Sequence, residues 1–156
     1  MLACLISMSI KAQRWVSFSS TAGQGAPVVN VLSSTAQSVS FEVTLSGIYK
    51  MDTIVNGVAF TRLMLPDGFA VNPSGSPEVP VLSYKVAIPD NDGVAVSYSV
   101  TSKQKMPSCW VYPTPQYVLG TNDEVVEQFM FDSTAYTQLY APEPVVMITS
   151  NGKFRE

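Results

Sequence analysis

Apolar and polar residues alternate along three stretches of this chain. In residues 38–46, valine, phenylalanine and leucine take every second position, and serine, glutamate and threonine fill the others. Residues 82–88 and 94–101 repeat the alternation. A period of two places successive side chains on opposite faces of a β-strand. We therefore predict three strands, the first with one buried face and one solvated face.

Turn signals divide the remaining chain into short segments. Asn56-Gly57 predicts a hairpin turn, and Gly47 predicts a bend or bulge. A rigid loop is expected at residues 72–80 and a turn at residues 89–93, whereas residues 123–131 fit either one helical turn or an extended segment. The other predicted strands or extended segments are residues 15–18, 28–32, 48–54, 58–65, 110–112 and 145–149.

Short strands separated by turns at this spacing are typical of all-β folds. We predict an antiparallel β-sandwich or a partly open barrel, with mostly short strands and long loops. The composition agrees, because valine, serine, threonine, tyrosine and phenylalanine dominate and helix formers are sparse. Apolar residues make up 46% of the chain, enough for a core, and nothing in the composition marks a second domain.

The first residues have the pattern of a targeting segment. An apolar run from Leu2 to Ile10 precedes Lys11-Ala12-Gln13. The run is too short to span a bilayer but fits the end of a secretory signal peptide. We therefore expect residues 1–13 to be the remnant of a signal and residues 14–156 to be a single domain. The alternative is a buried N-terminal strand.

Several classes of function are excluded by composition. The chain has no histidine, so an internal Cys-His or Ser-His pair is impossible. Its net charge is −3 and its nine basic residues are scattered, which argues against nucleic acid and anionic membranes. The two cysteines, Cys4 and Cys109, are too few for a disulfide framework. We expect no catalytic residues, no cofactor, no metal and no membrane span; the oligomeric state stays open.

Local motifs have plain structural interpretations. Asp90-Asn91-Asp92-Gly93 resembles a calcium loop, but position twelve is Thr101 instead of glutamate, so a hairpin turn is favoured. The acidic residues Glu124, Glu127 and Asp132 suit a solvated face better than acid-base catalysis. Cys109 is expected to be a structural thiol.

The late aromatic residues fit either a binding platform or a core: Trp110, Tyr112, Tyr117, Phe129, Phe131, Tyr136 and Tyr140.

Four short motifs, in a shared order, resemble the N-terminal prodomain of gingipain-like C25 family cysteine peptidases. The first is Gly75-Ser76-Pro77-Glu78-Val79-Pro80, which leads to Val86-Ala87-Ile88-Pro89. The second is Tyr112-Pro113-Thr114-Pro115. The third is Asp132-Ser133-Thr134-Ala135-Tyr136, followed by Leu139-Tyr140-Ala141-Pro142, and the fourth is Gly152-Lys153-Phe154-Arg155. The family-like structural residues are therefore Gly75, Pro77, Pro80, Tyr136, Gly152 and Arg155.

The resemblance implies a non-catalytic propeptide that keeps a secreted cysteine peptidase latent and assists its folding by covering the active-site face. The partner would be the cognate peptidase domain of the same precursor. The family pattern continues beyond Glu156, so a truncated prodomain is expected. The location implied is the periplasm, the exterior or the cell surface of a Gram-negative bacterium, often reached by type IX secretion. The alternative function is a stand-alone extracellular β-sandwich that binds glycans or proteins in adhesion.

Prodomains of this family are understood to place a basic residue in the substrate pocket of the enzyme. This chain has no lysine or arginine between Met106 and Gly152. The corresponding inhibitory or partner-binding loop is expected near Pro113 to Glu124, so any inhibitory side chain there is apolar or polar. The candidate residues of this loop are Pro113, Pro115, Tyr117, Leu119 and Asn122.

Overall fold

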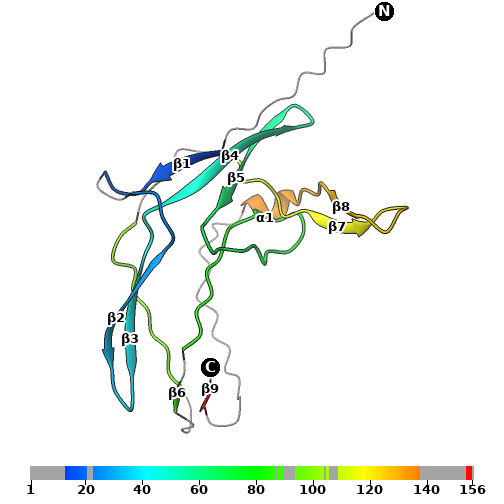
Figure 1. Cartoon of the computed structure of the whole chain (residues 1–156). Helices are drawn as coiled ribbons and strands as arrows, with labels where there is room; N and C mark the ends of the chain where they lie inside the picture. The colour runs from blue at the N-terminus through cyan, green and yellow to red at the C-terminus, as the bar shows by residue number, and fades with distance from the viewer. Residues whose placement is uncertain are drawn as a thin grey trace, which may run out of the picture.

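The computed structural model describes residues 13–20, 23–86, 88–89, 94–103, 105, 109–137 and 154–155. Figure 1 shows an open assembly of strands with one short helix. The elements are β1 (Gln13–Ser17), β2 (Val28–Ser34), β3 (Val39–Thr44), β4 (Gly47–Val55), β5 (Val58–Met64), β6 (Ile88–Pro89), β7 (Gln116–Leu119), β8 (Val125–Gln128), α1 (Ser133–Thr137) and β9 (Phe154–Arg155).

The predicted all-β class is confirmed. Each assigned strand pairs antiparallel with its neighbour, in the sheets β1-β4-β5, β2-β3, β6-β9 and β7-β8. No closed barrel forms within the described part of the chain, and the arrangement is sandwich-like. The helix has only five residues.

The hairpin predicted at Asn56-Gly57 joins β4 to β5. Both residues have positive φ, 51° and 80°, as a two-residue turn of the I′ class requires. The pairing then runs from Val55 opposite Val58 to Tyr49 opposite Met64. At the other end of β4, a Cβ on Gly47 would lie 2.6 Å from Trp15 ring atoms, so glycine lets β1 pack closely there.

Two irregular segments continue the sheet beyond β5. Residues 110–112 run parallel to β5, where the Thr61 amide donates to the Trp110 carbonyl at 2.7 Å and the Tyr112 amide donates to the Thr61 carbonyl at 2.8 Å. Residues 75–78 then lie on the far side, where the Glu78 amide donates to the Tyr112 carbonyl at 2.8 Å. The middle of the molecule is therefore a sheet wider than its assigned strands.

The core lies on this extended sheet. Its buried apolar side chains are Ile48, Phe60, Leu63 and Tyr112. Phe60 is the centre of an aromatic cluster, with ring centroids 5.6 Å from Phe129 and 6.1 Å from Tyr112. Edge-to-face contacts of this kind add to the stabilisation from burial.

β2 and β3 lie where strands were predicted and pair with each other, but the burial expected on one face of β3 is wrong. Val31 lies opposite Phe41 and Val29 opposite Val43, so these apolar side chains share a face. That face is nevertheless exposed, and Phe41 keeps 39% of its surface accessible. Among the described residues the β2–β3 ribbon pairs only with itself, and Lys85 and Val86 line an open groove with its apolar face.

The other two alternating stretches do not become the long strands that the pattern predicts. Residues 82–86 and 94–100 lie outside the assigned strands, and only β6 pairs, with β9. An extended segment needs a partner edge for its backbone hydrogen bonds before it counts as a strand. Within residues 123–131, for which one helical turn or an extended segment was predicted, Val125–Gln128 is extended and forms β8. The predicted turn at residues 90–93 and strand at residues 145–149 lie outside the described residues.

Candidate functional site

Three of the family-like motifs meet in one place. The Gly75 amide donates to the Thr114 carbonyl at 2.8 Å, and the Asp132 amide donates to the Gly75 carbonyl at 3.0 Å. Gly75 has a φ of 87°, and a Cβ there would lie 3.2 Å from the Asp132 nitrogen. Glycine is needed because both the left-handed backbone and the close approach disfavour a side chain.

Asp132 and Tyr136 attach the short helix to the sheet. The Asp132 carboxylate accepts a hydrogen bond from the Thr134 amide at 2.9 Å, which is the role of an N-cap. The Tyr136 hydroxyl donates to the Val111 carbonyl at 2.5 Å. Burial raises the pKa of this phenol, and the charge of Glu78 raises it further. The four-residue spacing of Asp132 and Tyr136 therefore places the N-cap of α1 and the tyrosine that holds α1 to the sheet on the same short helix.

The other family-like residues have structural positions where they are described. Pro77 forms an isolated antiparallel bridge with Pro113, and Pro80 lies beside a pocket. Arg155 lies opposite Ile88 in the pairing of β6 with β9. Gly152 lies outside the described residues.

The predicted inhibitory loop is divided by the fold. Pro113 is fully buried and Pro115 is buried, so both belong to the base of the loop. Tyr117 and Leu119 lie on β7 with 62% and 74% of their surface exposed, and Asn122 is exposed in the turn that follows. Only these last three residues are available to a partner in this conformation.

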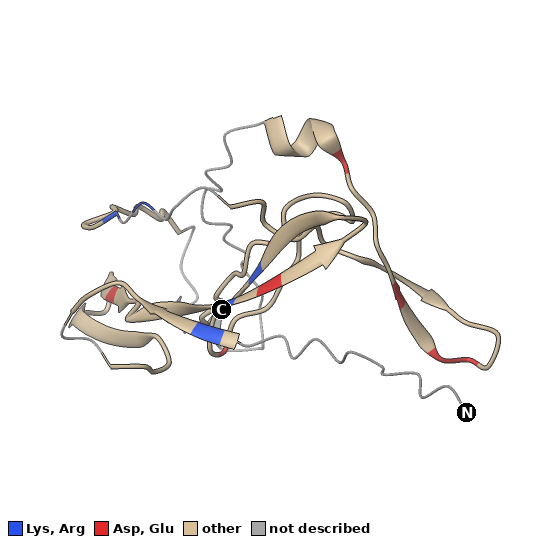
Figure 2. Cartoon of the chain, turned by 90° about the horizontal axis from the view of Figure 1, so that it is seen from above, with Lys and Arg blue, Asp and Glu red and all other residues tan. Residues whose placement is uncertain are grey.

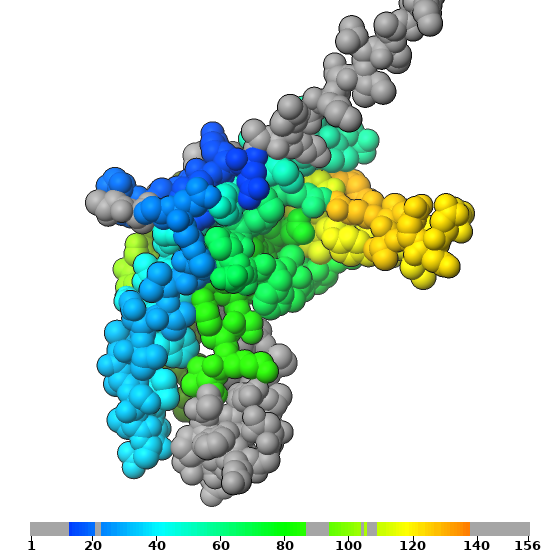
Figure 3. Space-filling model, in the orientation of Figure 1, coloured from blue at the N-terminus to red at the C-terminus, as the bar shows by residue number. Residues whose placement is uncertain are grey.

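A two-stranded arm, residues 116–128, carries these exposed residues. We call it the β7–β8 arm. Figures 1 and 3 show it standing out from the rest of the described chain. Leu119 lies opposite Val125, and the Gly120 amide donates to the Glu124 carbonyl at 2.7 Å, which closes the tip. Apolar side chains on an exposed ribbon of this size are typical of a contact surface for another protein.

Glu127 anchors the base of the arm to the core. Its carboxylate accepts a hydrogen bond from the Tyr112 hydroxyl at 3.0 Å and forms an ion pair with Arg62. The Arg62 guanidinium also lies 3.8 Å from the centre of the Tyr112 ring. Partial burial lowers the pKa of Arg62, but hydrogen bonds with Tyr112 and Glu127 and nearby negative charge outweigh it and raise the pKa overall. The sequence shows that Arg62 and Glu127 are charged, but no motif or spacing predicts that they pair.

The acidic cluster predicted from the sequence is dispersed. Glu127 belongs to the ion pair, Asp132 caps the helix, and Glu124 lies at the tip of the arm. Figure 2 shows acidic residues along the arm and toward α1, with basic residues elsewhere. Among the described residues, no three acidic or cysteine side chains gather to hold a metal ion.

The late aromatic residues mostly pack against one another. Trp110 and Phe131 have ring centroids 5.9 Å apart, and Phe131 and Tyr136 are 4.7 Å apart. Trp110 and Phe131 remain partly exposed, and Tyr117 is free on the arm. Cys109 is half-buried and forms no disulfide within the described part of the chain. No helix in that part has the length and apolar character needed to cross a bilayer.

Comparison with known proteins identifies the family. A family model described as Propeptide_C25 matches residues 19–156, which is most of the chain. No curated protein and no solved structure matches it. The matched range includes every motif that meets at Gly75 and the whole β7–β8 arm. The chain therefore belongs to the propeptide family of the C25 cysteine peptidases.

Proposed function

We propose that this domain keeps the peptidase domain of its own precursor latent and assists its folding. A propeptide domain is not itself catalytic, and membership of the family implies association with a peptidase domain. The mechanism proposed is steric: the propeptide covers the active-site face and excludes substrate. It needs a complementary interface, commonly about 1,600 Å² in total for a stable complex, and no reactive residue in this chain.

The observation that carries the proposal is the β7–β8 arm. It presents Tyr117 and Leu119 to solvent, and its base is fixed through Glu127. A contact element that is already ordered loses less conformational freedom on binding. Exposed aromatic and leucine side chains on such an element are suited to enter a depression on a partner.

The chemistry of the arm constrains the enzyme it would cover. Between Met106 and Gly152 the chain has no lysine or arginine, and the arm tip offers Leu119 and Asn122. A substrate pocket of the peptidase that selects basic residues would form no ion pair with the side chain of Leu119 or of Asn122. We therefore propose that the cognate peptidase does not prefer basic residues, or that the domain assists folding without filling the substrate pocket.

The proposal includes export of the precursor. The family suggests an extracellular or secreted protein. A signal remnant in residues 1–13 and a Gram-negative envelope, with type IX secretion, complete the proposed setting. Detection of the mature N-terminus in the culture medium by mass spectrometry would test this part.

The central experiment mixes this domain with the C25 peptidase domain encoded downstream in the same full-length gene. Binding and residual peptidase activity are measured together, and refolding of the denatured peptidase is followed with and without the propeptide. We expect tight binding with loss of activity and a higher yield of refolded enzyme. Folded propeptide that neither binds the peptidase nor raises that yield would overturn the proposal.

The arm is tested with a matched pair of variants. Leu119→Ala on the arm and Ile54→Ala beside the β4–β5 turn remove similar side chains that are both 74% exposed. We expect Leu119→Ala to weaken binding by about 10-fold or more, as truncation of a contact hot spot does, and Ile54→Ala to have little effect. Equal losses in the two variants would show that the arm is not the main contact.

A further inference from the structure

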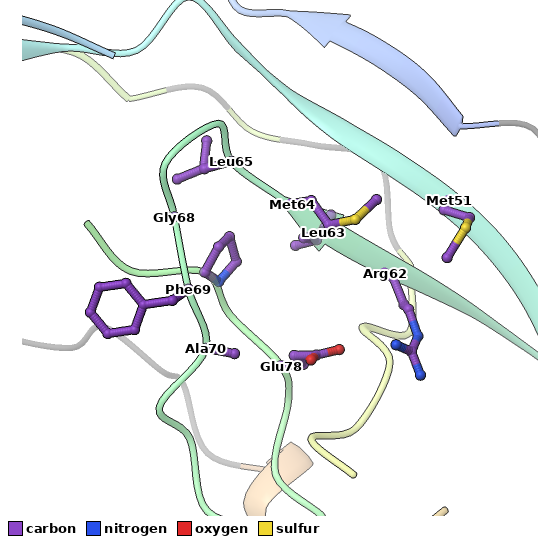
Figure 4. A pocket seen from close by; sticks show the side chains of 10 residues that line it. Met51, Arg62, Leu63, Met64, Leu65, Gly68, Phe69, Ala70 and Glu78 are labelled. Carbon is purple, nitrogen blue, oxygen red and sulfur yellow. The ribbon is translucent and has the colours of Figure 1, made fainter. Parts of the chain in front are cut away.

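A pocket opens between the β4–β5 hairpin and the segments that follow β5, as Figure 4 shows. Its volume is about 180 Å³. One water molecule needs about 10–15 Å³ of such volume, so the pocket has room for an extended side chain. Met51 from β4 and Met64 from β5 line it with apolar surface, and Arg62 and Glu78 supply its charged groups. Methionine walls adapt to irregular apolar shapes.

The charges around this pocket do not balance. Arg62 forms an ion pair with Glu127, and no ion pair joins Arg62 or another described cation to Glu78. One positive and two negative groups therefore leave one surplus negative charge. Glu78 is half-buried, and burial raises the pKa of its carboxyl group, with Arg62 opposing the rise and Glu127 adding to it. An incoming cation would relieve this uncompensated charge.

The pocket is linked to the base of the β7–β8 arm through Arg62. Arg62 lines the pocket on one side and holds Glu127 of the arm on the other. The arm itself carries acidic residues and no basic residue. A partner that covers the arm would therefore meet negative charge at the arm and again at Glu78, which favours a partner surface with basic side chains.

We propose that this pocket binds a lysine or arginine side chain of the peptidase domain. The aliphatic part of that side chain would lie against Met51 and Met64, and its cationic end would pair with Glu78. The inference rests on the proposed function for the identity of the partner. It adds a second contact, in which the enzyme inserts a side chain into the propeptide.

The proposal requires a particular pH dependence. The groups near Glu78 are Arg62, Glu127 and Tyr136. Only ionised Glu78 attracts a cation, so binding is strongest above the pKa of Glu78 and weakens as the pH falls through it. Replacing Glu78 with glutamine should weaken binding and remove this part of the pH dependence.

The pocket is tested first without the peptidase. The probe is n-propylguanidinium, with neutral n-propylurea as its control, and the readout is the ¹³C-methyl resonances of the methionines. We expect saturable shifts at Met51 and Met64 and none at Met130, which lies outside the pocket. Glu78→Gln should weaken probe binding by about 10-fold or more, as loss of a charge-assisted contact does. No saturable shift, or an equal response to the urea, would overturn the proposal.

The second test uses the peptidase domain. Glu78→Gln is compared with Glu42→Gln, which removes an exposed carboxylate of β3 away from the pocket. We expect weaker binding and a flatter pH profile only for Glu78→Gln. Normal binding by both variants refutes the pocket and leaves the proposed function standing. If wild-type propeptide has no effect on the peptidase, the proposed function fails, and the probe titration still decides the chemistry of the pocket.

Discussion

The β5 strand and the β3 strand contain similar residues and reach opposite environments. Both carry a phenylalanine within a run of apolar and polar residues. Each pairs antiparallel with the strand that precedes it in the chain. Phe60 on β5 keeps only 5% of its surface exposed, whereas Phe41 on β3 keeps 39%. The difference shows that the apolar face of a paired strand is buried only where other segments of the chain pack against it.

The covering layer comes from distant parts of the chain. Residues 110–112 lie along the edge of β5, and the Phe129 ring packs against Phe60. Beside the β2–β3 ribbon, the described residues form an open groove, which Lys85 and Val86 from the segment near β6 help to line. Burial of β5 thus depends on contacts between residues about 50 or more positions apart, which no local pattern records.

The largest expected effect comes from truncating the two phenylalanines. Phe60→Ala removes the centre of the aromatic cluster and should lower the free energy of unfolding by about 3–5 kcal/mol. Phe41→Ala removes a cross-strand pair on the exposed ribbon and should cost about 1 kcal/mol or less. Urea denaturation followed by tryptophan fluorescence measures both. Equal costs would mean that the ribbon face is buried in solution.

A smaller effect is expected for two glycines with positive φ. Gly57 has a φ of 80° with open space around it, whereas Gly75 has a φ of 87° and lies close to Asp132. Gly57→Ala should cost about 1 kcal/mol from the left-handed backbone. Gly75→Ala should cost about 2–3 kcal/mol, because the motif cluster must also shift. Thermal unfolding monitored by circular dichroism compares them. A Gly57→Ala cost equal to or above that of Gly75→Ala would contradict the close packing.

The smallest effect is expected from removing one hydroxyl group. Tyr136→Phe loses the hydrogen bond to Val111 and should cost about 1 kcal/mol. Tyr117→Phe on the exposed arm should change stability by less than about 0.5 kcal/mol. Urea unfolding at neutral pH separates the two variants. If they lose the same stability, the Tyr136 hydroxyl does not hold α1 to the sheet.

Alkaline pH provides a second readout for Tyr136. Its pKa is raised in the folded state, so the folded protein disfavours the phenolate. The wild-type stability should therefore fall as the pH rises above about 10, the usual pKa of tyrosine. Tyr136→Phe should lose less stability over the same range. An identical slope in both proteins would assign the alkaline loss to other groups.

The sequence by itself determined the all-β class, the β4–β5 hairpin and the membership of the family. Each depends on local chemistry: a period of two, an Asn-Gly turn that accepts positive φ, and short motifs in a fixed order. The prediction of a partner loop near Pro113 to Glu124 also comes from the sequence, because that region lies between recognisable motifs, and it stays a proposal. These features need only neighbours in the chain to be recognised.

Only the tertiary structure decided which of these residues are buried and which are exposed. Within one predicted loop, Pro113 became buried and Leu119 became exposed, because the hydrogen bonds to residues 75–78 enclose the first and the arm carries the second outward. The pairing of Arg62 with Glu127, which leaves Glu78 in surplus, joins residues far apart in the chain. Which charged side chains pair depends on how whole segments pack, so the order of charged residues along the chain does not predict these pairs.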